Sequence, residues 1–82
     1  GGIGLMPNPA TDHVTVGVNL ADSDKGTLSF MDMTGRMLYE QQVTKGETQV
    51  DFDLHKIGLT AGVYLVRLKH ANGQSVQRLV VR

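Results

Sequence analysis

The sequence has 82 residues, no cysteine and a formal net charge of zero, with eight Lys and Arg against eight Asp and Glu. This length suits one small domain, and the missing cysteines exclude disulfides, thiolate metal sites and cysteine nucleophiles. The balanced charge argues against nucleic acid or an anionic bilayer as the main partner, and no apolar run approaches the roughly 18 residues of a membrane-spanning helix.

The first residues of the chain carry few side chains, because Gly1, Gly2 and Gly4 surround a single isoleucine. We expect residues 1–4 to be a linker remnant or a leftover of expression with no structural element, and the domain to occupy residues 5–82. Pro7-Asn8-Pro9 follows, and its two prolines predict a rigid, extended lead-in to the first long strand.

Apolar side chains then recur at every second position, which is the period of a β-strand with one buried face. Six such runs begin about every 10 to 14 residues, none with a sustained helical period, although residues 54–59 could make one helical turn. The spacing predicts an all-β sandwich or barrel with mostly antiparallel strands. Its inward-facing residues are expected to be Val14, Val16, Val18, Leu20, Leu28, Phe30, Met37, Tyr39, Val43, Val50, Phe52, Leu54, Tyr64, Val66, Leu68, Leu79 and Val81.

Turn residues predict the strand register. Asn72-Gly73 is the strongest hairpin signal, because both residues tolerate the positive φ that a type I′ turn requires. A two-residue loop there predicts the opposed pairs Tyr64 with Val81, Val66 with Leu79, Leu68 with Gln77, and Arg67 with Arg78. The weaker turns Thr34-Gly35 and Lys45-Gly46 predict Phe30 opposite Tyr39, with a bulge near Met37 and Leu38, and Tyr39 opposite Phe52.

Candidate chemical groups are few. The histidines His13, His55 and His70 lie in three different segments without a ligand spacing, so we interpret them as ordinary surface residues. Asp22-x-Asp24-x-Gly26 is similar to the start of a calcium loop but lacks the later ligands, which favours a polar turn and leaves a weak calcium site open.

Asp51 and Asp53 should share the outward face of one strand, with Glu40 opposite. Paired carboxylates can act as acid and base in a cleft, but on an exposed strand they more often keep the surface soluble. No nucleophile elbow or phosphate-binding loop is present, so we expect no enzyme, no metal site and no cofactor.

The four methionines, Met6, Met31, Met33 and Met37, have two interpretations. They fill gaps in the core, as flexible side chains often do, or Met31 and Met33 form an exposed apolar patch for a partner.

Four short motifs occur in order along the chain. They are Pro7-Asn8-Pro9, then Asp32-Met33-Thr34-Gly35-Arg36-Met37-Leu38, then Leu59-Thr60-Ala61-Gly62-Val63-Tyr64-Leu65-Val66, and finally Arg78-Leu79-Val80-Val81-Arg82. Together they resemble the C-terminal sorting domain of proteins exported by the type IX, or Por, secretion system of Bacteroidetes. The resemblance implies an Ig-like antiparallel β-sandwich of about six to seven short strands that acts as a non-catalytic secretion signal.

The resemblance also implies partners and a route. The signal would direct an N-terminal cargo through the periplasm to translocon and shuttle components at the outer membrane, and then to the cell surface or the medium. A sortase-like surface protease usually removes such a domain. The implied recognition residues are Pro7, Asn8, Pro9, Gly35, Arg36, Gly62, Tyr64, Arg78, Leu79, Val80, Val81 and Arg82.

Three of these residues also have expected structural roles. Gly62 would occupy a position that a Cβ would obstruct, and Tyr64 would bury its ring while its hydroxyl reaches the sheet edge. The last strand would offer a free edge to which a partner adds a strand. An alternative remains open, an adhesive or carbohydrate-binding β-sandwich module, which would need a concave site or an aromatic platform.

Overall fold

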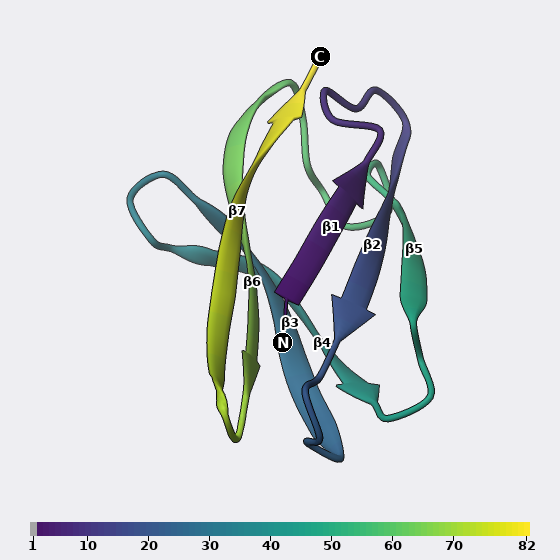
Figure 1. Ribbon diagram of the computed structural model, residues 1–82. Coiled ribbons are helices and arrows are strands. Elements are labelled where there is room, and N and C mark those ends of the chain that lie inside the picture. Colours follow the sequence, from purple (N-terminus) through teal and green to yellow (C-terminus); the bar gives the residue numbers. More distant parts are fainter. Residues whose placement is uncertain (1) are drawn as a thin grey trace.

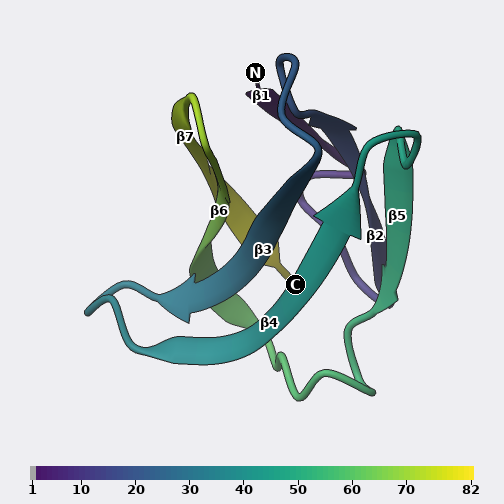
Figure 2. The same cartoon turned by 90° about the horizontal axis from the view of Figure 1, so that it is seen from below.

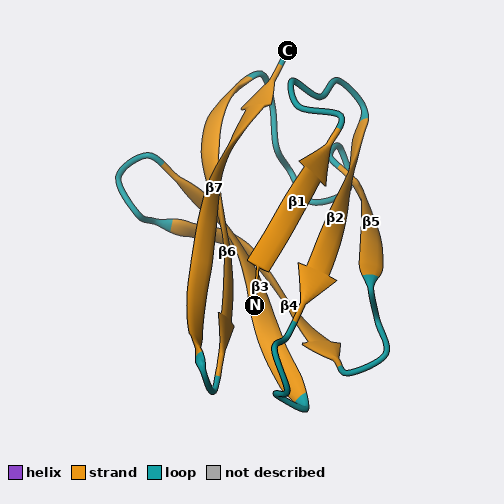
Figure 3. Ribbon diagram, viewed as in Figure 1, coloured by secondary structure: helices purple, strands orange, loops and turns teal. Residues whose placement is uncertain are grey.

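The computed structural model describes residues 2–82, which form seven strands and, within this range, no helix. The strands are β1 (Gly2–Met6), β2 (His13–Asn19), β3 (Lys25–Asp32), β4 (Met37–Thr44), β5 (Gln49–Asp53), β6 (Gly62–His70) and β7 (Gly73–Val81). They make two antiparallel sheets, in the orders β1-β2-β5 and β4-β3-β6-β7, which pack face to face (Figures 1 and 3). The predicted all-β, Ig-like sandwich is confirmed.

The core lies between the two sheets and consists of the inward-facing half of each alternating run. Phe30 and Phe52 come from different sheets, and their ring centroids lie 4.9 Å apart in an edge-to-face contact. Such a contact joins the sheets through a favourable quadrupole geometry as well as through burial. The core cluster comprises Ala10, Val14, Val16, Leu20, Leu28, Phe30, Val43, Phe52, Leu54, Leu59, Tyr64, Val66, Leu68, Leu79 and Val81.

The expectation that residues 1–4 form no structural element is wrong for residues 2–4, which belong to β1. Ile3 and Leu5 oppose Val18 and Val16 of β2 and pack against the core. The ladder between β1 and β2 uses backbone groups, so the neighbouring glycines take part without side chains. Gly1 lies outside the described residues, and the domain boundary at residue 5 stays a prediction.

The β3–β4 hairpin has the predicted register. Phe30 opposes Tyr39, and the register shifts directly beyond this pair so that Met31 opposes Met37. Leu38 is therefore the extra residue of the expected bulge. Met37 does not face inward, and 43% of its surface is exposed.

The β6–β7 hairpin has the correct faces but a register two residues from the predicted one. Tyr64 opposes Leu79 rather than Val81, and Arg67 opposes Val76 rather than Arg78. The loop closes one step earlier because Gly73 already pairs with His70, while the Asn72 side chain donates to Ser23 Oγ in the β2–β3 loop. A shift of two residues preserves which side chains point inward, so the predicted core survives.

The predicted pairing of β4 with β5 is wrong. The Lys45-Gly46 turn carries the chain from one sheet to the other, and β5 pairs with β2. Tyr39 and Phe52 still meet, but across the core, with ring centroids 6.0 Å apart. Asp51 consequently accepts a hydrogen bond from Thr15 Oγ1, and Glu40 lies opposite Ser29 on the other sheet.

Two smaller expectations concern local segments. Residues 54–59 form consecutive hydrogen-bonded turns, including Leu59 N to Leu54 O at 2.9 Å, rather than a helix. Met31 is buried with 8% of its surface exposed, whereas Met33 is 57% exposed, so these two do not form one exposed patch.

Candidate recognition site at one end of the sandwich

Pro7-Asn8-Pro9 lies in the β1–β2 connection, beside the end of β7 (Figure 1). The peptide bonds before both prolines are cis. The Asn8 amide donates from Nδ2 to the Arg78 carbonyl at 2.8 Å, and its Oδ1 accepts from the Val80 N–H at 3.0 Å. One side chain thus satisfies two backbone groups of a strand 70 or more residues away.

Ala10 continues the same contact. Its N–H donates to the Val80 carbonyl, and its own carbonyl accepts from the Arg82 N–H, each at 2.8 Å, which forms a parallel bridge to Val81. Ala10 is fully buried. β7 is an edge strand, as expected, but at this end its outer backbone groups are already bonded. The expected free edge for strand addition is therefore wrong for residues 78–82.

The start of β6 supplies the next part of the site. The Tyr64 ring is buried and its hydroxyl donates to the Thr60 carbonyl at 2.6 Å, which resembles the tyrosine corner of Ig-like sandwiches. This confirms the expected burial of Tyr64. The expected obstruction at Gly62 is wrong, because a Cβ there would lie 3.5 Å from the Tyr64 hydroxyl, an ordinary contact distance.

The β3–β4 turn is organised by Asp32. Its carboxylate accepts from the Thr34 hydroxyl at 2.6 Å, the Thr34 N–H at 2.9 Å and the Arg36 N–H at 3.0 Å, and it pairs with Arg36 Nε at 3.2 Å. The Thr34 hydroxyl and then the Arg36 amide hold the pKa of Asp32 below its ordinary value. Gly35 has φ +89°, a conformation that favours glycine. Figure 2 shows the turn of this hairpin projecting beyond the other strands.

Strand pairing brings the four motifs together. Tyr64 lies between Asp32 and Leu79 in one row across the sheet, and Val81 lies between Gly62 and Ala10 in the next. The motifs that are far apart in the sequence therefore form one continuous end of the sandwich. We define this end, residues 7–10, 32–36, 60–64 and 78–82, as the composite end.

The side chains of the composite end divide into supporting and outward groups. Leu79 and Val81 are buried in the core. Arg78 and Arg82 are exposed, Val80 is half-buried, and the Arg36 side chain is 76% exposed. A partner at this end would meet guanidinium groups carried on a rigid scaffold, because the buried residues fix the strand from which they project.

Sequence reasoning missed two members of this site. Asp32 was part of the quoted motif but not among the recognition residues, although its Asp-x-Thr-Gly spacing is typical of a side chain that caps its own turn. Ala10 gives no sequence signal of its role, because a small apolar residue after Pro9 is compatible with many environments.

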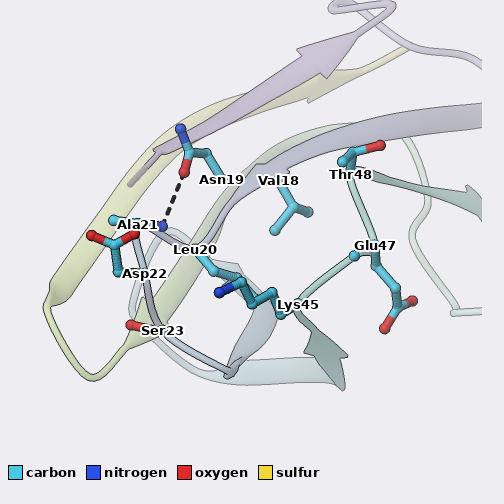
Figure 4. Close-up of a pocket in the computed structure, with 10 residues that line it drawn as sticks. Val18, Asn19, Leu20, Ala21, Asp22, Ser23, Lys45, Glu47 and Thr48 are labelled. Atoms are coloured by element: carbon cyan, nitrogen blue, oxygen red, sulfur yellow. Dashed lines mark hydrogen bonds between the residues drawn. The ribbon is translucent and has the colours of Figure 1, made fainter.

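One surface hollow outside the composite end is lined by side chains that stabilise local turns. This hollow of about 330 Å³ lies between the β2–β3 loop and the β4–β5 turn (Figure 4). Its Asn19 accepts the Ala21 N–H at 2.9 Å, and its Glu47 accepts the Thr44 N–H at 2.8 Å, so both side chains stabilise local turns. Within residues 2–82, no three His, Asp or Glu side chains are arranged to hold a metal ion.

Two further observations concern binding platforms. Phe30, Phe52 and Tyr64 are buried, and Tyr39 is partly buried against Phe30 and Phe52, so the described residues present no flat aromatic surface for a sugar ring. No helix in the described part of the chain is long and apolar enough to cross a membrane.

The fold and the site together define a small Ig-like β-sandwich. Its β1–β2 connection, its β3–β4 hairpin and its last strand, β7, are joined at one end. The model of the family described as the secretion system C-terminal sorting domain matches residues 5–82, so the chain belongs to the type IX secretion sorting domains. This family consists of non-catalytic sorting signals and implies export through the outer membrane. No curated protein matches the chain.

Proposed function

We propose that this domain carries an N-terminal cargo through the periplasm and that the outer-membrane type IX machinery recognises its composite end. The observation that supports this most strongly is the convergence of four distant motifs on that end, through the Asn8 and Ala10 bonds to β7 and the row Asp32, Tyr64 and Leu79. Recognition then depends on a folded surface rather than on the last residues alone.

The recognition roles in this proposal are of two kinds. Arg36, Arg78 and Arg82 contact the partner, because their guanidinium groups are exposed and can form bidentate bonds with carboxylates or phosphates. Asn8 and Tyr64 are positioning residues that hold the backbone from which these groups project. Pro7, Pro9, Gly35, Gly62, Leu79, Val80 and Val81 support the same shape.

The experiment is a fusion of the whole chain behind a periplasm-directed reporter in a type IX-competent cell. We expect the reporter on the cell surface or in the medium, and a reporter that stays in the periplasm would refute the function. Arg78→Gln with Arg82→Gln should reduce export, whereas Lys45→Gln with Lys56→Gln, which removes the same charge elsewhere, should not.

We further propose that a sortase-like surface protease removes the domain after export. The family membership supports this step. Mass spectrometry of the surface-exposed reporter tests it: loss of the whole domain is the expected result, and an intact tail on every exported molecule would contradict removal.

A further inference from the structure

The sheet β4-β3-β6-β7 has an outer face that no other element covers in Figure 1. Strand alternation places its side chains opposite the core residues Leu28, Phe30, Val66 and Leu68. We define the outer face by Lys25, Thr27, Ser29 and Met31 of β3, Glu40 and Gln42 of β4, Val63, Leu65, Arg67 and Lys69 of β6, and Val76 and Arg78 of β7.

One half of the outer face is apolar. Met31 is 8% exposed yet is not part of the core cluster, and its cross-strand partner Leu65 is half-buried. Val63 lies next to Leu65 on the same face of β6 and is 41% exposed, whereas Val76, 46% exposed, lies on β7 opposite Arg67. A contiguous apolar patch on a solvent-facing sheet can mark an interaction surface.

Arg67 lies beside this apolar half with an unsatisfied donor. Its Nε is buried and has no hydrogen-bond partner among residues 2–82, and the same holds for the Oγ of Ser29, its cross-strand partner. Buried polar atoms in native proteins are nearly always hydrogen-bonded, so each exception calls for an explanation. Arg67 as a whole is half-buried, so a carboxylate of a partner can approach its side chain although the Nε itself is inaccessible in the unbound domain.

The other half of the outer face is basic. Lys25 and Lys69 line a hollow of about 600 Å³ together with Thr27, Gln42 and, from the loop before β3, Asp24. Neither lysine forms an ion pair within residues 2–82, and Glu40 is the one carboxylate that the strands carry on this face. By contrast, the strands of the other sheet carry Asp51 and Asp53 but no Glu, Lys or Arg. The strands of the two sheets therefore differ in the sign of their charge.

We propose that the outer face docks an acidic protein segment of the export machinery, one that places carboxylates at Lys25, Lys69 and Arg67 and apolar side chains on Val63 and Leu65. This inference rests on the proposed function and extends the recognition surface along the sheet from the composite end, with which the outer face shares Val63 and Arg78. The positive charge of the outer face predicts a negatively charged partner, and its apolar half predicts that this partner is a protein.

Two other occupants fit the face less well. A second copy of this chain could offer the acidic Asp51 and Asp53, but apart from Met6 the outward positions of their sheet are glycine or polar, among them Gly4, Thr15 and Gly17. An anionic lipid surface would match the lysines but supplies no defined acceptor for a partly buried guanidinium.

The test compares two double variants of the reporter fusion that remove equal charge. Lys25→Gln with Lys69→Gln changes exposed side chains of the outer face and should lower the initial rate of export about tenfold, as the loss of steering charges slows association. Lys45→Gln with Lys56→Gln is the matched control and should leave the rate within about twofold. Equal rates for the unaltered and outer-face fusions would overturn the docking surface alone, whereas no export of the unaltered fusion would refute the proposed function.

Crosslinking identifies the occupant. A photo-crosslinking residue at Val76 of the outer face should give a protease-sensitive adduct that disappears in cells lacking the outer-membrane translocation machinery. The same residue at Thr15, on the other sheet, should give none. An adduct at Val76 with lipid only, or with a second copy of this chain only, would overturn the proposal, as would an adduct at Thr15 alone during active export.

Discussion

The two hydrogen bonds of the Asn8 side chain lead to the most specific prediction about the composite end. Asn8→Ala removes the donor to the Arg78 carbonyl and the acceptor for the Val80 N–H without changing the charge. Each neutral hydrogen bond contributes about 1 kcal/mol net, and both bonds are exposed, so water recovers part of the loss. We expect the free energy of unfolding to fall by about 1–2 kcal/mol and the melting temperature by roughly 4–8 °C per kcal/mol.

Hydrogen exchange and export separate this local effect from general destabilisation. The Val80 amide should exchange about tenfold faster in the variant, a factor that corresponds to about 1.4 kcal/mol, and the exported fraction of the fusion should fall. Asn72→Ala is the matched control, because Asn72 also donates twice from its side chain, to Ser23 Oγ and the Ala21 carbonyl, at the opposite end of the sandwich. Similar destabilisation with unchanged Val80 exchange and unchanged export is expected there. If both variants reduce export equally, Asn8 acts only through stability and the reasoning fails.

The remaining predictions concern stability and pH. Gly26→Ala should lower the free energy of unfolding by about 1–3 kcal/mol in urea titration. The new Cβ would lie 3.0 Å from a backbone carbonyl of β6 and 2.7 Å from a core leucine. Gly4→Ala is the control and should not destabilise, because no atom lies within 4 Å of its new Cβ. Tyr64→Phe should cost about 1–2 kcal/mol in the same assay through loss of its partly buried hydrogen bond, and an unchanged midpoint would contradict that role. The Thr34 hydroxyl lowers the pKa of Asp32, so this carboxylate stabilises the hairpin above its unfolded pKa of 3.8, and that contribution should be lost as pH falls through the lower folded value. The Asp32 carboxyl carbon resonance should titrate with a midpoint below 3.8.

The two-residue period of the apolar side chains predicted which face of each strand is buried better than it predicted which strands pair. Val66 and Leu68 point into the core although the β6–β7 register is shifted, because a shift of an even number of residues leaves every side chain on its face. The Lys45-Gly46 turn shows the opposite case. Local turn chemistry indicates a reversal of the chain, but whether the next strand joins the same sheet depends on packing across the core, here between Tyr39 and Phe52.

The roles of the site residues could be predicted where they depend on adjacent residues, but not where they depend on partners far away in the sequence. The Gly35 turn could be predicted because a positive φ is a property of a few adjacent residues. The role of Asn8 could not, since its partners on β7 are 70 and 72 residues away and nothing near Asn8 indicates them. Glycine at 62 was assigned a steric role that belongs to Gly26, where three atoms crowd the missing Cβ.

The closure of residues 8–10 onto β7 has a consequence for the order of events in the cell. Synthesis releases Asn8 before Val80, which is 72 residues further along, so the two can meet only after the whole stretch between them has been made. An incompletely folded tail contains the same residues without the surface that they build together. An export machinery that recognises this surface would therefore transport only cargo whose sorting domain has folded. Cargo with an unfolded sorting domain would not be exported.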